Sequence, residues 1–201
     1  MNAKAVKGIA FAAIILVAIP IGLSAKDPAG SVLVWNPVLS SSIERLTAES
    51  RTFREAIDAL GLTGRHAVLT TPDHLPERIT IDFDATVLAQ AYPLTAERSR
   101  VDTVVVVFNI DLLQKLSGLS MSAIDFEDDL DRIVAHEVYG HAIPVLMAGN
   151  LSGHCADPAV GQSAMASCAV QRENVIRKEM NLGLRLDYGR ESLALAHRYH
   201  H

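Results

Sequence analysis

The sequence is poor in the residues on which nucleic-acid-binding proteins depend. Aromatic side chains make up 5% of its 201 residues, and 23 acidic against 18 basic side chains give a formal net charge of −5. Contacts to phosphates need a basic face, and stacking of bases needs an aromatic platform. The composition therefore argues against a nucleic-acid partner. With 49% hydrophobic and 20% charged residues, the chain is instead typical of a globular protein.

Cysteine is equally scarce, since only Cys155 and Cys168 occur. An even number in an exported chain permits one disulfide across a short loop, whereas two buried free thiols fit the sequence equally well. A bridge would stabilise the fold by roughly 2–4 kcal/mol. His154 beside Cys155 suggests a metal pair, but no C-x-x-C spacing supports it. If the chain is exported, we expect the two cysteines to be oxidised to each other.

Charge is absent from one long stretch near the start of the chain. Lys4 and Lys7 precede an uncharged apolar run at 8–25, which has the layout of a secretory signal and ends in small residues. The run is also long enough to serve as an uncleaved membrane anchor. We therefore expect residues 1–25 to be a signal peptide or an N-terminal anchor. Residues 26–201 then form a single domain that is secreted, periplasmic or held at a membrane outside the cytoplasm.

Hydrophobic periodicity predicts a mixture of strands and helices. A capping-box spacing of Ser41 and Glu44 opens one expected helix, and a run of β-branched residues marks the strongest expected strand. Strands are predicted at 66–71, 78–84 and 101–111, and helices at 41–61, 111–118, 122–149, 159–183 and 190–201. The predicted class is α+β, a small sheet packed against helices.

The residues with the clearest chemistry lie on the expected helix at 122–149. His136 is followed directly by Glu137, and His141 stands five positions after the first histidine. Catalytic zinc takes three protein ligands of the histidine or carboxylate type and keeps a fourth position for water. An adjacent glutamate can then accept the proton of that water. These residues predict a zinc site with Glu137 as general base.

The spacing of the two histidines requires a distorted helix. Positions four apart on an α-helix diverge by about 40°, but positions five apart diverge by about 140°. A π-bulge that absorbs one residue would bring both rings to one face. Gly140 is a poor helix former, and Pro144 removes the amide that would bond the carbonyl of Gly140. The alternative is that His136 is a core residue and His141 faces solvent.

Residues further along the chain favour the metal site. Glu173 lies on the next expected helix, where it can supply a third ligand, and Arg177 follows one turn later to orient its carboxylate. Arg185 and Tyr188 then occur at R-x-x-Y spacing. Their positive charge and hydroxyl suit an oxyanion that forms on a zinc-bound carbonyl.

The motif H-E-V-Y-G-H resembles the H-E-x-x-G-H zinc motif of dipeptidyl peptidase III, in which the histidines are also five apart. The stretch 136–188, roughly a quarter of the chain, is more similar to compact zinc-peptidase domains of bacterial effectors and RHS-type toxins. Its order of motifs is also similar to that of clostridial neurotoxin light chains. The resemblance implies a zincin-like fold with an active-site metal helix. The roles that it implies are zinc ligands (His136, His141, Glu173), general base (Glu137) and transition-state donors (Arg185, Tyr188).

Together these features predict an exported zinc-dependent peptidase, an endopeptidase acting on a protein or peptide substrate. Effector, toxin and housekeeping roles fit it equally. The rival hypothesis is a non-catalytic envelope or secreted interaction module that keeps the fold, with or without the metal. Other acidic and histidine side chains are expected to be loop, cap or surface residues, not zinc ligands: Asp82, Asp84, Asp102, His66, His74 and the terminal histidines 197, 200 and 201.

Overall fold

The computed structural model describes residues 31–76, 79–95, 100–117, 123–155 and 167–186. The expected signal or anchor at 1–25 and the expected helix at 190–201 lie outside these ranges. Within them, no helix has the length and hydropathy needed to cross a bilayer.

A four-stranded sheet of order β1-β2-β4-β3 forms one layer of the domain. Strands β1, β2 and β4 are parallel, and β3 pairs antiparallel with β4 at one edge. The predicted strands at 66–71 and 101–111 are confirmed, and 104–107 are fully buried, as a strand covered on both faces requires. The strands are β1 (Val32–Val34), β2 (His66–Thr70), β3 (Ala89–Thr95) and β4 (Val101–Phe108).

The strand predicted at 78–84 is wrong, because its described part, 79–84, forms no strand. Its alternating apolar side chains, Ile79, Ile81 and Phe83, pack instead on the sheet face that bears Val68, Leu94, Val105 and Val107. These side chains alternate with polar ones because every second residue is packed against the sheet, although the backbone of the segment does not pair with a strand.

Strand β3 was not predicted, because its sequence has little β-propensity. It contains two alanines and Pro93, and proline is tolerated in a sheet at an edge, where its missing amide breaks no ladder. Only pairing with β4 identifies this segment as a strand.

The single helix predicted at 41–61 is two helices, α1 (Pro37–Glu49) and α2 (Arg51–Gly61). Ser50 interrupts them in an extended conformation, and its hydroxyl accepts the amide of Phe53 at 3.0 Å. The predicted capping box at Ser41 is also wrong. Asn36 caps α1 through the amide of Val38 at 2.9 Å, since proline at the following position is preset for a helix start. The apolar side chains that recur at helical spacing in this segment are buried: Ile43, Leu46, Phe53, Ile57 and Leu60.

The helical run predicted at 122–149 is confirmed and ends at Gly149, whose φ is 69°. It consists of α4 (Ala123–Val134), the π-helix η3 (Ala135–Ala142) and α5 (Ile143–Ala148). The predicted helix at 111–118 is confirmed as α3 (Ile110–Ser117). Two short 3₁₀ turns are η1 (Pro72–His74) and η4 (Leu151–Gly153).

The helix predicted at 159–183 is shorter in the structure, where α6 spans Cys168–Glu179. Ser167 is extended and accepts the amide of Val170 at 3.3 Å, so that it caps the helix at this point. At the other end Asn181 has a φ of 57°, which stops the helix before Gly183. Residues 159–166 lie outside the described ranges.

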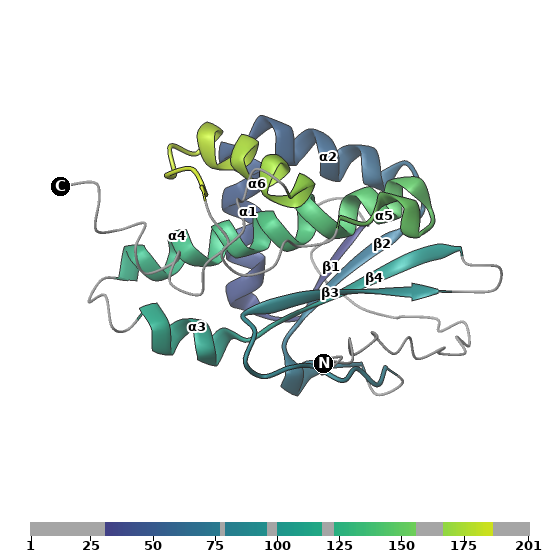
Figure 1. Ribbon diagram of the computed structural model, residues 1–201, viewed down its shortest axis with the longest axis horizontal. Helices are drawn as coiled ribbons and strands as arrows, with labels where there is room; N and C mark the ends of the chain where they lie inside the picture. The colour runs from purple at the N-terminus through teal and green to yellow at the C-terminus, as the bar shows by residue number, and fades with distance from the viewer. Residues whose placement is uncertain (1–30, 77–78, 96–99, 118–122, 156–166, 187–201) are drawn as a thin grey trace, which may run out of the picture.

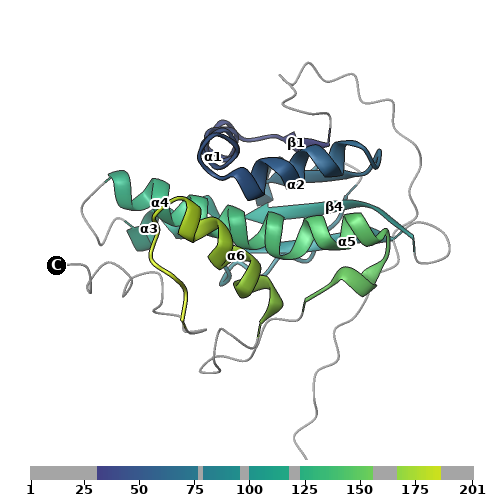
Figure 2. The ribbon, with the colours of Figure 1, turned by 90° about the horizontal axis from the view of Figure 1, so that it is seen from above.

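All the helices except α3 form a layer against one face of the sheet, with η3 and α5 running over β4, whereas α3 lies beneath α4 at the end of the sheet (Figure 1). Helix α6 crosses against η3, as the second view shows (Figure 2). The large core cluster lies between the two layers and includes Leu39, Phe108, Val138 and Leu146. The α+β class is therefore confirmed, and the π-helix lies between the sheet and α6.

Candidate metal site

The helix is π-helical at the histidine motif. The amide of Ile143 donates to the carbonyl of Val138, five residues back. This confirms the prediction that regular i→i−4 bonding is lost around Val138 to His141. A π-helical turn holds one more residue than an α-helical turn, so the two histidines, five positions apart, lie on a common face of the helix.

The two imidazoles meet edge to face inside the domain. His136 Nε2 and His141 Nε2 lie 3.2 Å apart, and the ring centroids are separated by 4.8 Å with planes at 79°. Two nitrogens that bind one tetrahedral zinc ion at 2.0–2.1 Å are about 3.3 Å apart. Both histidines are buried, at 5% and 6% exposure. The pair therefore has the separation that a shared ion requires.

Glu137 completes a group of three potential ligands. Its carboxylate and the ring nitrogens of His136 and His141 all lie within 4.8 Å of one another. Glu137 is buried, which limits competition by bulk water. At this distance the carboxylate can reach a water molecule held at the two imidazoles.

Glu173 contacts His136 at the other edge of its ring. Its Oε2 accepts a hydrogen bond from His136 Nδ1 at 2.9 Å. Burial alone would raise the pKa of Glu173, but the hydrogen bond and charge of His136 and the charges of Arg177 and Arg185 lower that pKa to about 2. An ionised carboxylate only accepts, so Nδ1 carries the proton, and in the neutral form of the ring the Nε2 lone pair then faces His141.

Two arginines also donate to the Glu173 carboxylate. Arg177 Nη1 donates to Oε1 at 2.6 Å, and Arg185 Nη1 donates to Oε2 at 3.3 Å. The carboxylate therefore makes its closest contacts away from the two Nε2 atoms. Of the expected site residues, the structure brings His136, Glu137 and His141 together. Glu173 lies on the Nδ1 side of the His136 ring, and Arg185 contacts Glu173 there. Tyr188 lies outside the described residues.

Asn174 fixes the segment that carries Arg185. Its Nδ2 donates to the carbonyl of Arg185 at 2.9 Å, and its Oδ1 accepts the amide of Arg185 at 2.8 Å. This role of Asn174 was not predicted from the sequence. The spacing of Glu173, Asn174 and Arg177 could have indicated it. It places a carboxylate, an amide that can bind a backbone segment and a guanidinium within about one turn of α6.

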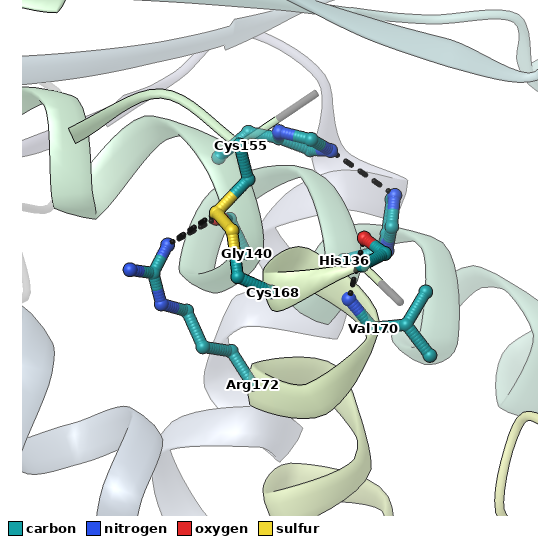
Figure 3. Close-up of a disulfide and its surroundings, with 8 residues drawn as sticks. His136, Gly140, Cys155, Cys168, Val170 and Arg172 are labelled. Atoms are coloured by element: carbon teal, nitrogen blue, oxygen red, sulfur yellow. Dashed lines mark hydrogen bonds between the residues drawn. A yellow bond between two sulfur atoms is a disulfide. The ribbon is translucent and has the colours of Figure 1, made fainter. Parts of the chain in front are cut away.

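Arg172 and a disulfide connect α6 to the motif from the other side (Figure 3). Arg172 Nη1 donates to the carbonyl of Gly140 at 3.0 Å and contacts Cys155 Sγ at 3.1 Å. Cys155 and Cys168 form a disulfide with a Cα–Cα distance of 5.9 Å, within the usual range. The alternative of two free thiols is therefore excluded, and the role of Arg172 was missed because it needs the tertiary contact.

The residues expected to play other roles have local partners. His74 contacts Thr71 Oγ1 at 2.9 Å, Asp84 accepts from the amide of Thr86 at 2.8 Å, and Asp102 accepts from Arg100 at 2.7 Å. Neither these residues nor His66 and Asp82 belong to the cluster at His136, among the residues described.

No protein-family model, curated protein or solved structure matches this chain. The resemblance to zinc peptidases thus rests on the motif residues alone. Function must be argued from the geometry of the site.

Proposed function

We propose that this protein is a zinc-dependent peptidase. The observation that carries the proposal is the 3.2 Å separation of His136 Nε2 and His141 Nε2 on a π-helix, beside a buried glutamate. Two imidazoles and a carboxylate are the donor set that zinc prefers, although other transition metals accept it as well. We also propose that the α+β fold is zincin-like.

The residues of the chain divide into those that hold the metal and those that move protons. His136 and His141 bind the ion, which supplies an activated water and a Lewis acid for the scissile carbonyl. Glu137 accepts the proton of the attacking water and returns it to the leaving amine. Arg185, which donates to Glu173 at 3.3 Å, is proposed to stabilise the oxyanion together with the Tyr188 hydroxyl.

The position of β3 supports a peptide as the substrate. This strand ends the sheet order, so one of its edges pairs with no strand among the described residues, and it contacts η3. An extended peptide can add to such an edge through main-chain hydrogen bonds. It would then lie beside the motif helix, with its backbone presented to the metal.

Export is proposed on two independent grounds. The basic start and apolar run of the sequence have the layout of a signal or anchor. The disulfide between Cys155 and Cys168 is of the kind that persists in oxidising compartments. A secreted or periplasmic location, or membrane attachment through residues 8–25, is compatible with both.

Metal analysis combined with a hydrolysis assay tests the proposal. The purified chain is expected to hold about one equivalent of zinc and to cleave a quenched-fluorescent peptide library. Glu137→Gln should keep the zinc and lose hydrolysis. The double variant His136→Ala, His141→Ala should lose the zinc, whereas His74→Ala, at an exposed histidine of η1, should retain both properties. Full zinc occupancy in the double variant would contradict the assignment.

The enclosure of the site favours a second candidate, a non-catalytic metal-binding module. His136, Glu137 and His141 are exposed by 5%, 8% and 6%, and structural zinc sites are closed to solvent. In that case the Glu137→Gln variant would match the parent protein in every hydrolysis assay, and removal of the metal would change only the unfolding temperature.

A further inference from the structure

We propose that His154 is the third protein ligand of the metal and that the Cys155–Cys168 disulfide holds it in place. The inference rests on the proposed metal site at His136 and His141. It assigns Glu173 to orienting His136 and not to binding the ion. It also makes metal binding depend on an oxidising compartment.

The ring of His154 lies about 1 Å farther from that of His141 than shared binding of one ion requires. When two imidazoles bind the same tetrahedral zinc, their ring centres lie about 5 Å apart. The centroids of His136 and His141 are 4.8 Å apart, and those of His141 and His154 are 6.0 Å apart with planes tilted by 34°. The group of potential ligands that the structure already brings together holds His136, Glu137 and His141, so binding by His154 requires its exposed side chain to turn toward the ion.

The contacts of Glu173 favour an orienting role. It accepts from His136 Nδ1, while the lone pair of Nε2 points toward His141. A carboxylate at this edge fixes the tautomer of a ligating histidine, as in carboxylate–histidine–zinc arrangements. Its two oxygens also accept from Arg177 and Arg185, on the Nδ1 side of the His136 ring, so we look for the third ligand on another segment.

Two constraints fix the backbone on either side of His154. On one side Gly153 lies so close to α5 that a Cβ there would collide with the carbonyl of Pro144. On the other side Cys155 is buried and bonded to Cys168, the first residue of α6. A residue between two such anchors has little freedom. His154 therefore stays near His141 although its side chain is exposed.

The disulfide makes this arrangement conditional on oxidation. Closure of the bridge removes two protons and two electrons from the two thiols, and an acceptor disulfide takes them up to become a dithiol. Without the bridge, the segment at 153–155 loses its covalent link to α6. His154 is then held only from the side of Gly153, and its contribution to metal binding falls.

The test measures the affinity for Zn²⁺ alone, by chelator competition, and the visible spectrum with Co²⁺. His154→Gln keeps the approximate size of the side chain but cannot replace the imidazole. It is expected to weaken zinc binding by about 100-fold or more, beyond the usual 10–100-fold for an orienting partner, and to change the Co²⁺ absorption. His74→Gln is the matched control and should bind as the parent does.

The disulfide is tested with the double variant Cys155→Ser, Cys168→Ser, because serine neither bridges nor supplies a thiolate to the metal. Its zinc affinity should fall by about tenfold or more, and reduction of the parent protein by a phosphine should have the same effect. If His136→Ala abolishes zinc binding but His154→Gln leaves it unchanged, this inference is overturned and the proposed function stands. If His136→Ala also leaves it unchanged, the metal site itself is wrong.

Discussion

The guanidinium of Arg172 donates to the carbonyl of Gly140 at 3.0 Å, across the contact between α6 and the π-helix (Figure 3). Four residues after Gly140 stands Pro144, which has no amide to offer in a regular helix. Arg172 thus supplies a donor that the helix itself lacks. The distortion that brings His136 and His141 together is stabilised by a side chain from another helix.

We expect Arg172→Met to destabilise the protein, because the carbonyl of Gly140 and the sulfur of Cys155 lose a charged donor. A hydrogen bond to a charged group contributes about 1.5–3 kcal/mol to the free energy of unfolding, and Arg172 is only partly buried, so the lower end applies. Urea denaturation measures the loss. Lys178→Met, at an exposed position of the same helix, is the control and should change little.

The approach of α6 to the π-helix depends on the absence of a side chain at Gly140. A Cβ there would lie 3.1 Å from the Cβ of Ala169 and 3.2 Å from its carbonyl oxygen. Gly140→Ala should therefore destabilise the fold by about 1–3 kcal/mol through overpacking, although alanine is the better helix former. Adding Ala169→Gly should restore part of the loss, and strictly additive effects in this double-mutant cycle would argue against the contact.

Glu173→Gln should weaken zinc binding and lower stability together. The amide cannot compensate Arg177 and Arg185, and it no longer selects the Nδ1 proton of His136. Loss of such an orienting group reduces metal affinity by about 10–100-fold, and chelator competition measures it. Glu179→Gln, also on α6 but bonded to Ser50 and Thr52, should bind zinc as the parent does. Unchanged affinity in the Glu173 variant would remove that residue from the site.

Tyr188→Phe should leave zinc binding unchanged and lower kcat by roughly 10²–10³, the usual cost of one oxyanion donor. The hydroxyl is required only when charge develops on the carbonyl oxygen, so metal content and KM should remain close to those of the parent. Steady-state kinetics with a peptide substrate measure kcat and KM separately. A variant that lost zinc would show instead that Tyr188 supports the metal site.

Glu179 gives a pH dependence whose sign is fixed by its surroundings. Burial would raise its pKa, but hydrogen bonds from Ser50 and Thr52 lower it below the ordinary value. Its folded-state pKa is thus lower than its unfolded-state pKa. The stabilising contribution is full above the unfolded pKa, near pH 4.5, and is lost as the pH falls through the folded pKa. Thermal unfolding between pH 7 and pH 3 should show the parent protein more stable than Glu179→Gln at the high end and the difference shrinking at the low end.

The sequence by itself determined the α+β class, the buried β4, the long motif helix and the need for a distorted turn between His136 and His141. These follow from local properties: a run of β-branched residues, helical periodicity, and the angle between two positions five apart on a helix. It also pointed to His136, Glu137 and His141, which the structure brings together, although it expected Glu137 to be the general base and Glu173 to be the third ligand. Local rules were sufficient for these elements, but they missed the cap at Asn36 and the break at Ser50.

Only the tertiary structure decided which long-range partner each of these residues has. The edge strand β3 depends on pairing with β4, because Pro93 and its alanines give no strand signal. Sequence spacing placed Glu173 near the motif helix, but its contact with Nδ1 of His136 depends on how α6 crosses η3. The proximity of His154 to His141 is set by Gly153 and by the disulfide. Such contacts join separate segments, and the packing angle between those segments is a property of the whole core and not of any local pattern.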